Sequence, residues 1–190
     1  MRALILEAKA NGVRAFVFPA SRFVFNQPEA QTMSDRLSVE FVPSINGWLQ
    51  VTLRSHDMEL DDRVSYTPND FLSELASALV AFLETRRQCV ARWSLEPDGY
   101  DVLLEAGGVP SSLRVKVIVS PDQRGDRPRG APEVVLVHEG DALLVGRTFW
   151  RAFRRPESRF DHASWGRSFP SGIVAQLGRL TARRTGGSPG

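Results

Sequence analysis

The sequence lacks most features of a secreted or membrane protein. It has a single cysteine, Cys89, which excludes an internal disulfide and is typical of a chain kept in a reducing compartment. It has no run of about 18 apolar residues, the length that a transmembrane helix needs. The apolar stretch after Met1 is too short for a signal-peptide core, and Glu7 interrupts it. These absences predict a cytoplasmic protein.

Sequence motifs that carry catalytic chemistry are also missing. The patterns Gly-x-Ser-x-Gly and Gly-x-Gly-x-x-Gly and the Walker loop do not occur. His56, His138 and His162 are not at metal-ligand spacing from one another or from Cys89, although the folded chain could still bring them together. We therefore predict no catalytic residue, no metal site and no cofactor. An enzyme whose site is assembled from separated residues stays open as an alternative.

Lysine is scarce, and the arginines are unevenly distributed. Lys9 and Lys116 are the only lysines, so 22 of the 24 basic residues are arginine. Residues 147–190 hold nine arginines against Glu157 and Asp161, a net charge of +7, which leaves 15 basic and 20 acidic residues, or −5, before them. The chain thus has an acidic body and a basic end. An arginine-biased genome and selection for a ligand would both produce this asymmetry.

The clearest pattern present is an amphipathic helix predicted at residues 68–86. Thr67 is placed to cap it, Pro68 suits the first helical position, and Asp70 lies near the positive end of the helix dipole. Its apolar residues recur at three- and four-residue spacing: Phe71, Leu72, Leu75, Leu79, Phe82 and Leu83. A helix with this stripe needs a hydrophobic sheet to pack against.

Alternating strand patterns lie on both sides of this helix. They occupy residues 37–42, 48–54, 89–95, 100–105, 113–119 and 133–138. Short turns such as Asn46-Gly47 join neighbouring strands, so the strands should pair antiparallel. The predicted fold is α+β: a meander-like antiparallel sheet of about five to seven strands, with the main helix (68–86) on one face and helical segments near the C-terminus. A doubly wound nucleotide-binding fold is not expected.

The ends of the chain differ from its centre. Residues 142–155 have helical spacing in their second half, with Pro156 ending that helix, and Ile173–Leu180 suits a last short helix. We predict a single domain over 33–160 and a basic, partly disordered segment over 161–190. Prolines break up residues 1–32, and Met33 reads like a native start. These residues are interpreted as an extension outside the native fold, with an edge hairpin as the alternative.

An acidic cluster is the first candidate binding site. Residues 56–63 include Asp57, Glu59, Asp61 and Asp62, and we interpret this segment as either a solvated loop or a surface for a basic protein partner. A calcium loop is not indicated, because its glycine and terminal glutamate are absent.

An arginine-rich stretch is the second candidate. Arg147, Arg151, Arg154 and Arg155 interleave with aromatic residues, a combination that can hold phosphates and stack on bases. Against this, aromatic residues at helical spacing are typical of a core, and the acidic body would repel a polyanion. A nucleic-acid-associated protein is therefore the alternative function.

Four segments carry a resemblance to known proteins: Trp48-Leu-Gln-Val, Tyr66-Thr-Pro-Asn-Asp-Phe-Leu-Ser-Glu-Leu-Ala-Ser-Ala-Leu, Arg92-Trp-Ser-Leu-Glu-Pro-Asp-Gly-Tyr and Phe149-Trp-Arg-Ala-Phe-Arg-Arg. Over about residues 36–155 the chain resembles poorly characterised small bacterial proteins similar to the immunity proteins of polymorphic toxin systems. The resemblance implies a stoichiometric partner that masks a toxin by occlusion, and it assigns no site residue. We therefore predict a non-enzymatic, cytoplasmic protein-binding module.

Overall fold

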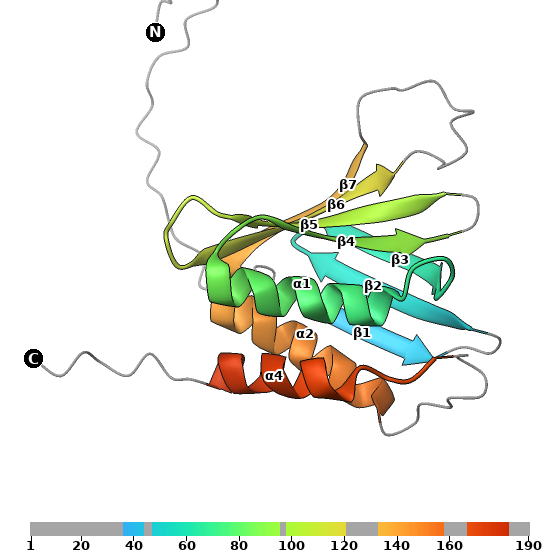
Figure 1. Cartoon of the computed structure of the whole chain (residues 1–190). Helices are drawn as coiled ribbons and strands as arrows, with labels where there is room; N and C mark the ends of the chain where they lie inside the picture. Colours follow the sequence, from blue (N-terminus) through green and yellow to red (C-terminus); the bar gives the residue numbers. More distant parts are fainter. Residues whose placement is uncertain (1–35, 44–46, 96–97, 121–132, 158–166, 183–190) are drawn as a thin grey trace, which may run out of the picture. The chain divides into compact units, whose positions relative to one another are not determined.

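The computed structural model describes residues 36–43, 47–95, 98–120, 133–157 and 167–182, and everything below concerns these residues. Figure 1 shows their arrangement. In chain order the elements are β1 (Ser38–Pro43), β2 (Trp48–Ser55), β3 (Met58–Ser65), α1 (Phe71–Thr85), β4 (Cys89–Ser94), β5 (Gly99–Ala106), β6 (Ser112–Ser120), β7 (Val134–Asp141), α2 (Ala142–Glu157) and α4 (Ser171–Ala182). The predictions about residues 1–32 and Met33 lie outside the described residues.

The strands form one seven-stranded antiparallel sheet in the order β1 to β7, which confirms the predicted α+β class and its meander. Most neighbours are joined by long ladders, but β3 and β4 meet at a single residue pair, Ser65 and Ser94. Helix α1 connects these two strands. Its Glu74 Oε2 accepts a hydrogen bond of 2.9 Å from the backbone N–H of Arg92 on β4. The helix thereby satisfies part of a strand edge that β3 leaves unpaired.

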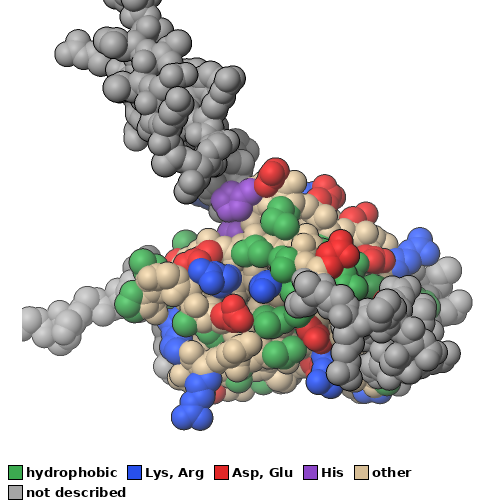
Figure 2. Space-filling view, turned by 90° about the horizontal axis from the view of Figure 1, so that it is seen from above, with side chains coloured by type: hydrophobic (Ala, Val, Ile, Leu, Met, Phe, Trp, Pro, Cys, Tyr) green, Lys and Arg blue, Asp and Glu red, His purple; other side chains and the backbone are tan. Residues whose placement is uncertain are grey.

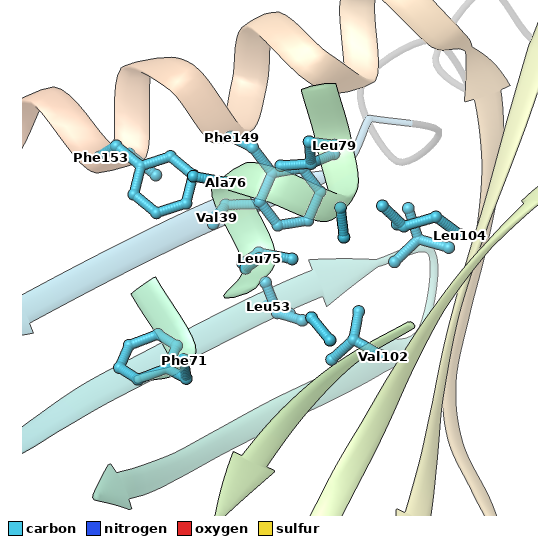
Figure 3. Packing of buried hydrophobic residues seen from close by; sticks show 14 of the residues in the cluster. Val39, Leu53, Phe71, Leu75, Ala76, Leu79, Val102, Leu104, Phe149 and Phe153 are labelled. Atoms are coloured by element: carbon cyan, nitrogen blue, oxygen red, sulfur yellow. The ribbon is translucent and has the colours of Figure 1, made fainter. Parts of the chain in front are cut away.

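Helices cover one face of this sheet (Figure 1), and the core lies between the two layers. The alternation along β2 points Leu49, Val51 and Leu53 toward the helices, and all three are fully buried. Figure 3 shows how Leu75 and Leu79 of α1 and Phe149 and Phe153 of α2 fill the space above the strands. Burying each of these large side chains contributes about 1.5–3 kcal/mol to folding.

The N-terminus of α1 differs from the prediction. The helix begins at Phe71, and its cap is Asp70, whose Oδ1 accepts from the Ser73 backbone N–H at 3.4 Å and whose Oδ2 accepts from the Ser73 hydroxyl at 2.8 Å. The prediction that Thr67 is the cap and Pro68 the first helical residue is wrong. The Thr67 hydroxyl instead lies 3.0 Å from that of Ser65, at the end of β3.

The predicted loop at residues 56–63 is also wrong, because Met58–Ser65 is strand β3 and only His56 and Asp57 make the turn. Two apolar side chains place this strand in the sheet: Leu60 lies opposite Leu53, and Val64 lies opposite Leu49. The charged residues between them do not prevent pairing, since Asp61 and Arg63 lie on the solvated face and the Asp62 carboxylate, on the core face, accepts a hydrogen bond from Tyr100.

The C-terminal helices exist as predicted, with different bounds. Helix α2 begins earlier, at Ala142, where Asp141 Oδ1 accepts from the backbone N–H groups of residues 143 and 144 at 3.0 Å each. Pro156 lies inside its last turn rather than ending it. Helix α4 places Val174 and Leu177 in the same core as α1 and α2, so residues 171–182 pack onto the sheet domain. No helix in the described ranges is long and apolar enough to cross a membrane.

Candidate binding surfaces

The structure divides the four predicted acidic residues between two faces of the sheet. Asp57 is exposed in the β2–β3 turn, and Glu59 and Asp61 point away from the helices. Asp62 lies opposite Val51, on the core face, where it accepts a hydrogen bond of 2.9 Å from the Tyr100 hydroxyl. Burial and then this hydrogen bond raise the pKa of Tyr100 to about 12. The four carboxylates therefore do not form one surface.

The two acidic residues that do share a face are already paired within the chain. Glu59 forms an ion pair of 2.7 Å with Arg54 directly across the β2–β3 ladder. Asp61 accepts from Thr52 Oγ1 at 2.6 Å and from Gln50 Nε2 at 2.8 Å, and these hydrogen bonds hold the pKa of Asp61 below its usual range. The outer face of β2 and β3 is thus a polar, internally satisfied network.

Three of the four predicted arginines also make contacts within the fold. Arg147 Nη2 donates to the backbone oxygen of Thr181 at 2.6 Å and so satisfies the end of α4. Arg154 pairs with Glu157, and Arg155 Nη1 lies 3.5 Å from Glu40 Oε1 on β1.

Arg151 is exposed and has no ion pair with any described residue. The aromatic neighbours Phe149 and Phe153 are fully buried, so neither presents a ring to stack on a base, whereas Trp150 is partly exposed. Of the three aromatic rings in the predicted combination on this helix, Trp150 is therefore the one that remains partly accessible beside the exposed Arg151.

Two histidines come together at the tip of the β2–β3 hairpin. Ser55 Oγ lies 2.9 Å from Nδ1 of His138 on β7, and the rings of His56 and His138 are 6.2 Å apart. Ser55 and His138 are buried, at 1% and 4% exposure, which closes the serine oxygen to a substrate. Nor do the described residues contain a group of three or more His, Cys, Asp or Glu side chains suited to a metal ion. The Ser55–His138 contact therefore holds the tip of the β2–β3 hairpin against β7.

A surface that sequence reasoning missed lies on the other side of β4 to β7. Its apolar side chains are Val90, Leu103, Ile118, Val134 and Val137, and we call this the outer β4–β7 surface. Val90 is 47% exposed and Val134 is 39% exposed. Figure 2, seen from the side away from the helices, shows hydrophobic side chains gathered among charged ones. No described helix covers this face.

One signal in the sequence could have indicated this surface. Strands β5 to β7 are apolar at successive positions, as in Leu103-Leu104, Val117-Ile118 and Leu136-Val137, so they present apolar side chains on both faces. Strand β2 differs, since Gln50, Thr52 and Arg54 occupy its outer positions. The apolar character of the outer face is thus confined to the β4–β7 half of the sheet.

Charges of both signs accompany these apolar residues. Arg92 Nε lies 3.9 Å from Asp101 Oδ1, and Arg114 donates to Glu139 Oε2 through Nε at 3.1 Å and Nη2 at 2.8 Å. The backbone N–H of Gly108 donates to Glu139 Oε1 at 2.6 Å, and this bond, with Arg114 second, holds the pKa of Glu139 below its usual range.

Two charged side chains on the same surface are not paired with any described side chain. Glu105 on β5 and Lys116 on β6 form no hydrogen bond or ion pair with any side chain in the described ranges. The surface therefore combines apolar side chains with two internal ion pairs and with Glu105 and Lys116, which no described side chain pairs.

Comparisons with known proteins identified no relative of this chain. No family model matches the sequence, and neither a curated protein nor a solved structure matches the chain.

Proposed function

We propose that this chain is a non-enzymatic, cytoplasmic protein-binding module that uses the outer β4–β7 surface to cover part of another protein. The observation that carries the proposal is the presence of two cross-strand apolar pairs, Val90 with Leu103 and Ile118 with Val134, on a face that no described helix covers. Lys116 lies between Leu103 and Val137 on the same face. Contiguous apolar side chains on an exposed face are typical of interaction sites. Ile118 lies two residues from Lys116 on β6 and directly opposite Asp101 of β5.

The contacts of the charged residues favour this surface over the two predicted from sequence. The carboxylates of Glu59, Asp61 and Asp62 already accept hydrogen bonds or ion pairs within the chain, so a partner would have to displace those contacts. By contrast, Val90 and Leu103 lose nothing but water when they are covered, and burying apolar area contributes about 25 cal/mol per Å².

The proposed mechanism is occlusion, the form implied by the resemblance to immunity proteins. A sheet whose strands are joined by long ladders presents its surface already formed, so that binding orders few additional groups. A toxin whose active cleft is covered in this way is inhibited without any chemical step. No residue of the surface is required to transfer a proton or bind a metal ion.

A site-specific crosslinking experiment in the native host tests this proposal. A photo-crosslinking residue at position 103 should join the chain to one protein in near-stoichiometric yield, while the same residue at position 50, on the polar outer face of β2, should not. The captured protein should be toxic when it is expressed alone and tolerated when the chain is co-expressed. The variant Leu103→Asp should lose this protection and keep its fold by circular dichroism.

Equal crosslinking from positions 103 and 50 would remove the outer β4–β7 surface from consideration. Protection that survives Leu103→Asp would place the masking contact elsewhere on the chain. A specific crosslinked partner without toxicity would leave a binding module and overturn the immunity-like mechanism.

A further inference from the structure

Three arginines of α2 form a stripe on the side of the helix that faces away from the sheet. Arg147, Arg151 and Arg154 follow one another at spacings of four and three residues, so they lie along one line of the helix surface. On the opposite side, Phe149 and Phe153 are fully buried in the core. At a rise of about 1.5 Å per residue, the stripe is about 10 Å long. It therefore presents several positive charges in a row rather than at one point.

The guanidinium groups of this stripe keep hydrogen-bond donors for a ligand. Arg151 is exposed and forms no ion pair with a described residue. Arg147 uses Nη2 for the backbone oxygen of Thr181, and a guanidinium carries five N–H donors, so other donors remain. The ion pair between Arg154 and Glu157 lies at the surface, where such pairs are weak and easily exchanged. Contacts within the fold therefore position the stripe without neutralising it.

An aromatic ring lies beside the stripe, where α2 crosses α4. A Cβ atom added at Gly178 would lie 2.6 Å from Nε1 of Trp150, so this edge of the indole is held against α4. The indole is nevertheless partly exposed. The next residue of α4, Arg179, is exposed and has no ion pair with a described side chain. We call Arg147, Arg151, Arg154, Trp150 and Arg179 the α2–α4 surface.

The positive charge of the fold is concentrated on these two helices. Together α2 and α4 hold five arginines against Glu157, a net charge of +4. The seven strands hold eight acidic and five basic residues, a net charge of −3. The stripe lies about one helix diameter, roughly 10 Å, above the sheet, which exceeds the Debye length of about 8 Å at physiological salt. The repulsion expected from an acidic body is therefore weak at this surface.

From these features we infer that the α2–α4 surface binds single-stranded nucleic acid. The arginines hold successive phosphates, because a guanidinium is weakly hydrated and bonds phosphate oxygens in pairs. An unpaired base stacks on the open part of the Trp150 indole, a contact that every base can make. The surface lies on the helices, apart from the outer β4–β7 surface, so a nucleic acid and a protein partner can be bound together.

The same residues favour a nucleic acid over a lipid membrane. A helix that lies in a membrane interface needs a broad exposed apolar face. The apolar face of α2 is buried in the core, and Leu144, at 60% exposure, is the one strongly exposed large apolar side chain among the described residues of α2 and α4. A duplex is disfavoured as well, because its paired bases would leave the indole without a stacking partner.

Fluorescence anisotropy of a labelled, mixed-sequence single strand of about 12 nucleotides tests the inference. The logarithm of the binding constant should fall with the logarithm of the salt concentration, with a slope of about −0.7 for each phosphate that is neutralised. Arg151→Ala and Arg179→Ala should each weaken binding about fivefold and make the slope shallower by about 0.7. Arg92→Ala is the matched control, because it removes an exposed arginine from the outer face of β4, and it should change neither quantity.

The indole provides a second readout. The strand should quench the tryptophan fluorescence of the wild-type chain, and the quenching should be largely lost in Trp150→Phe. A thermal melt checks that each variant is folded. A wild-type chain that does not bind the strand at low salt overturns the inference, as does an equal loss of affinity in Arg151→Ala and Arg92→Ala. Tighter binding to the duplex, or to vesicles of anionic phospholipid, would also overturn it. None of these outcomes alters the crosslinking expected at position 103, so the two proposals fail separately.

Discussion

The substitution Gly178→Ala tests how closely α4 packs on α2. A Cβ atom added at Gly178 would lie 2.6 Å from Nε1 and 3.1 Å from Cε2 of the Trp150 indole. Carbon atoms in contact normally lie about 3.5–4.0 Å apart, so the indole or the helix must move. Trp150 is rigid and packed against the core, so it has little room to move. The substitution therefore introduces a clash at the crossing of two helices.

The magnitude follows from two opposing effects. Alanine is favoured over glycine in a helix interior by about 1 kcal/mol. Overfilling a packed contact destabilises by about 1–3 kcal/mol. We expect Gly178→Ala to lower the free energy of unfolding by up to about 2 kcal/mol, despite its better helix propensity.

The same helix supplies the control. A Cβ atom added at Gly172 meets nothing within 4 Å, so Gly172→Ala should raise the free energy of unfolding by about 0.5 kcal/mol. Urea unfolding followed by circular dichroism measures both variants. Combining Gly178→Ala with Trp150→Leu should give a smaller loss than the sum of the single losses, because the shorter side chain removes the clash. If Gly178→Ala stabilises the chain as much as Gly172→Ala does, the Trp150 indole does not pack as closely against Gly178 as stated here.

Three other predictions follow from individual contacts. Asp62→Asn should lower the pKa of Tyr100 part of the way from about 12 toward 10.0, as measured by ultraviolet titration. Because the pKa is raised only in the folded state, the wild-type chain loses stability between about pH 10 and pH 12, and the variant should lose less over the same range. Glu139→Gln should flatten the fall in melting temperature below about pH 4.5, because the lowered pKa of Glu139 stabilises the fold only while its carboxylate is charged. Phe153→Ala should lower the free energy of unfolding in urea by about 3–5 kcal/mol, and Arg151→Ala should lower it by less than about 0.5 kcal/mol. Similar losses in the two variants would contradict the assignment of Phe153 to the core and Arg151 to solvent.

The sequence predicted the sheet well where one strand carries its own pattern. On β6, Leu113, Val115 and Val117 alternate with charged residues, and all three are fully buried. On β3 the apolar residues Leu60 and Val64 are too few to indicate a strand. Pairing with β2 fixes that strand, and such pairing depends on a neighbour rather than on local composition.

The start of α1 and the outer β4–β7 surface could not be predicted, for two different reasons. Thr67 and Asp70 are both good caps, and the hydrogen bonds from Ser73 to the Asp70 carboxylate show which one caps the helix. Val90 and Leu103 are apolar and suit a core. Whether such residues are covered depends on which face of the sheet the three helices pack against, and the sequence pattern within a strand does not indicate that face.

The seam between β3 and β4 has a consequence for the local opening of the fold. Amides in a strand ladder exchange their hydrogens with solvent when the paired strands separate. The amide of Arg92 is held instead by the Glu74 side chain of α1, so its exchange should follow the release of that carboxylate rather than the opening of the sheet. The protection of that one amide reports how often the Glu74 carboxylate leaves the edge of β4, and Glu74→Ala should accelerate its exchange ahead of the amides of β5 and β6.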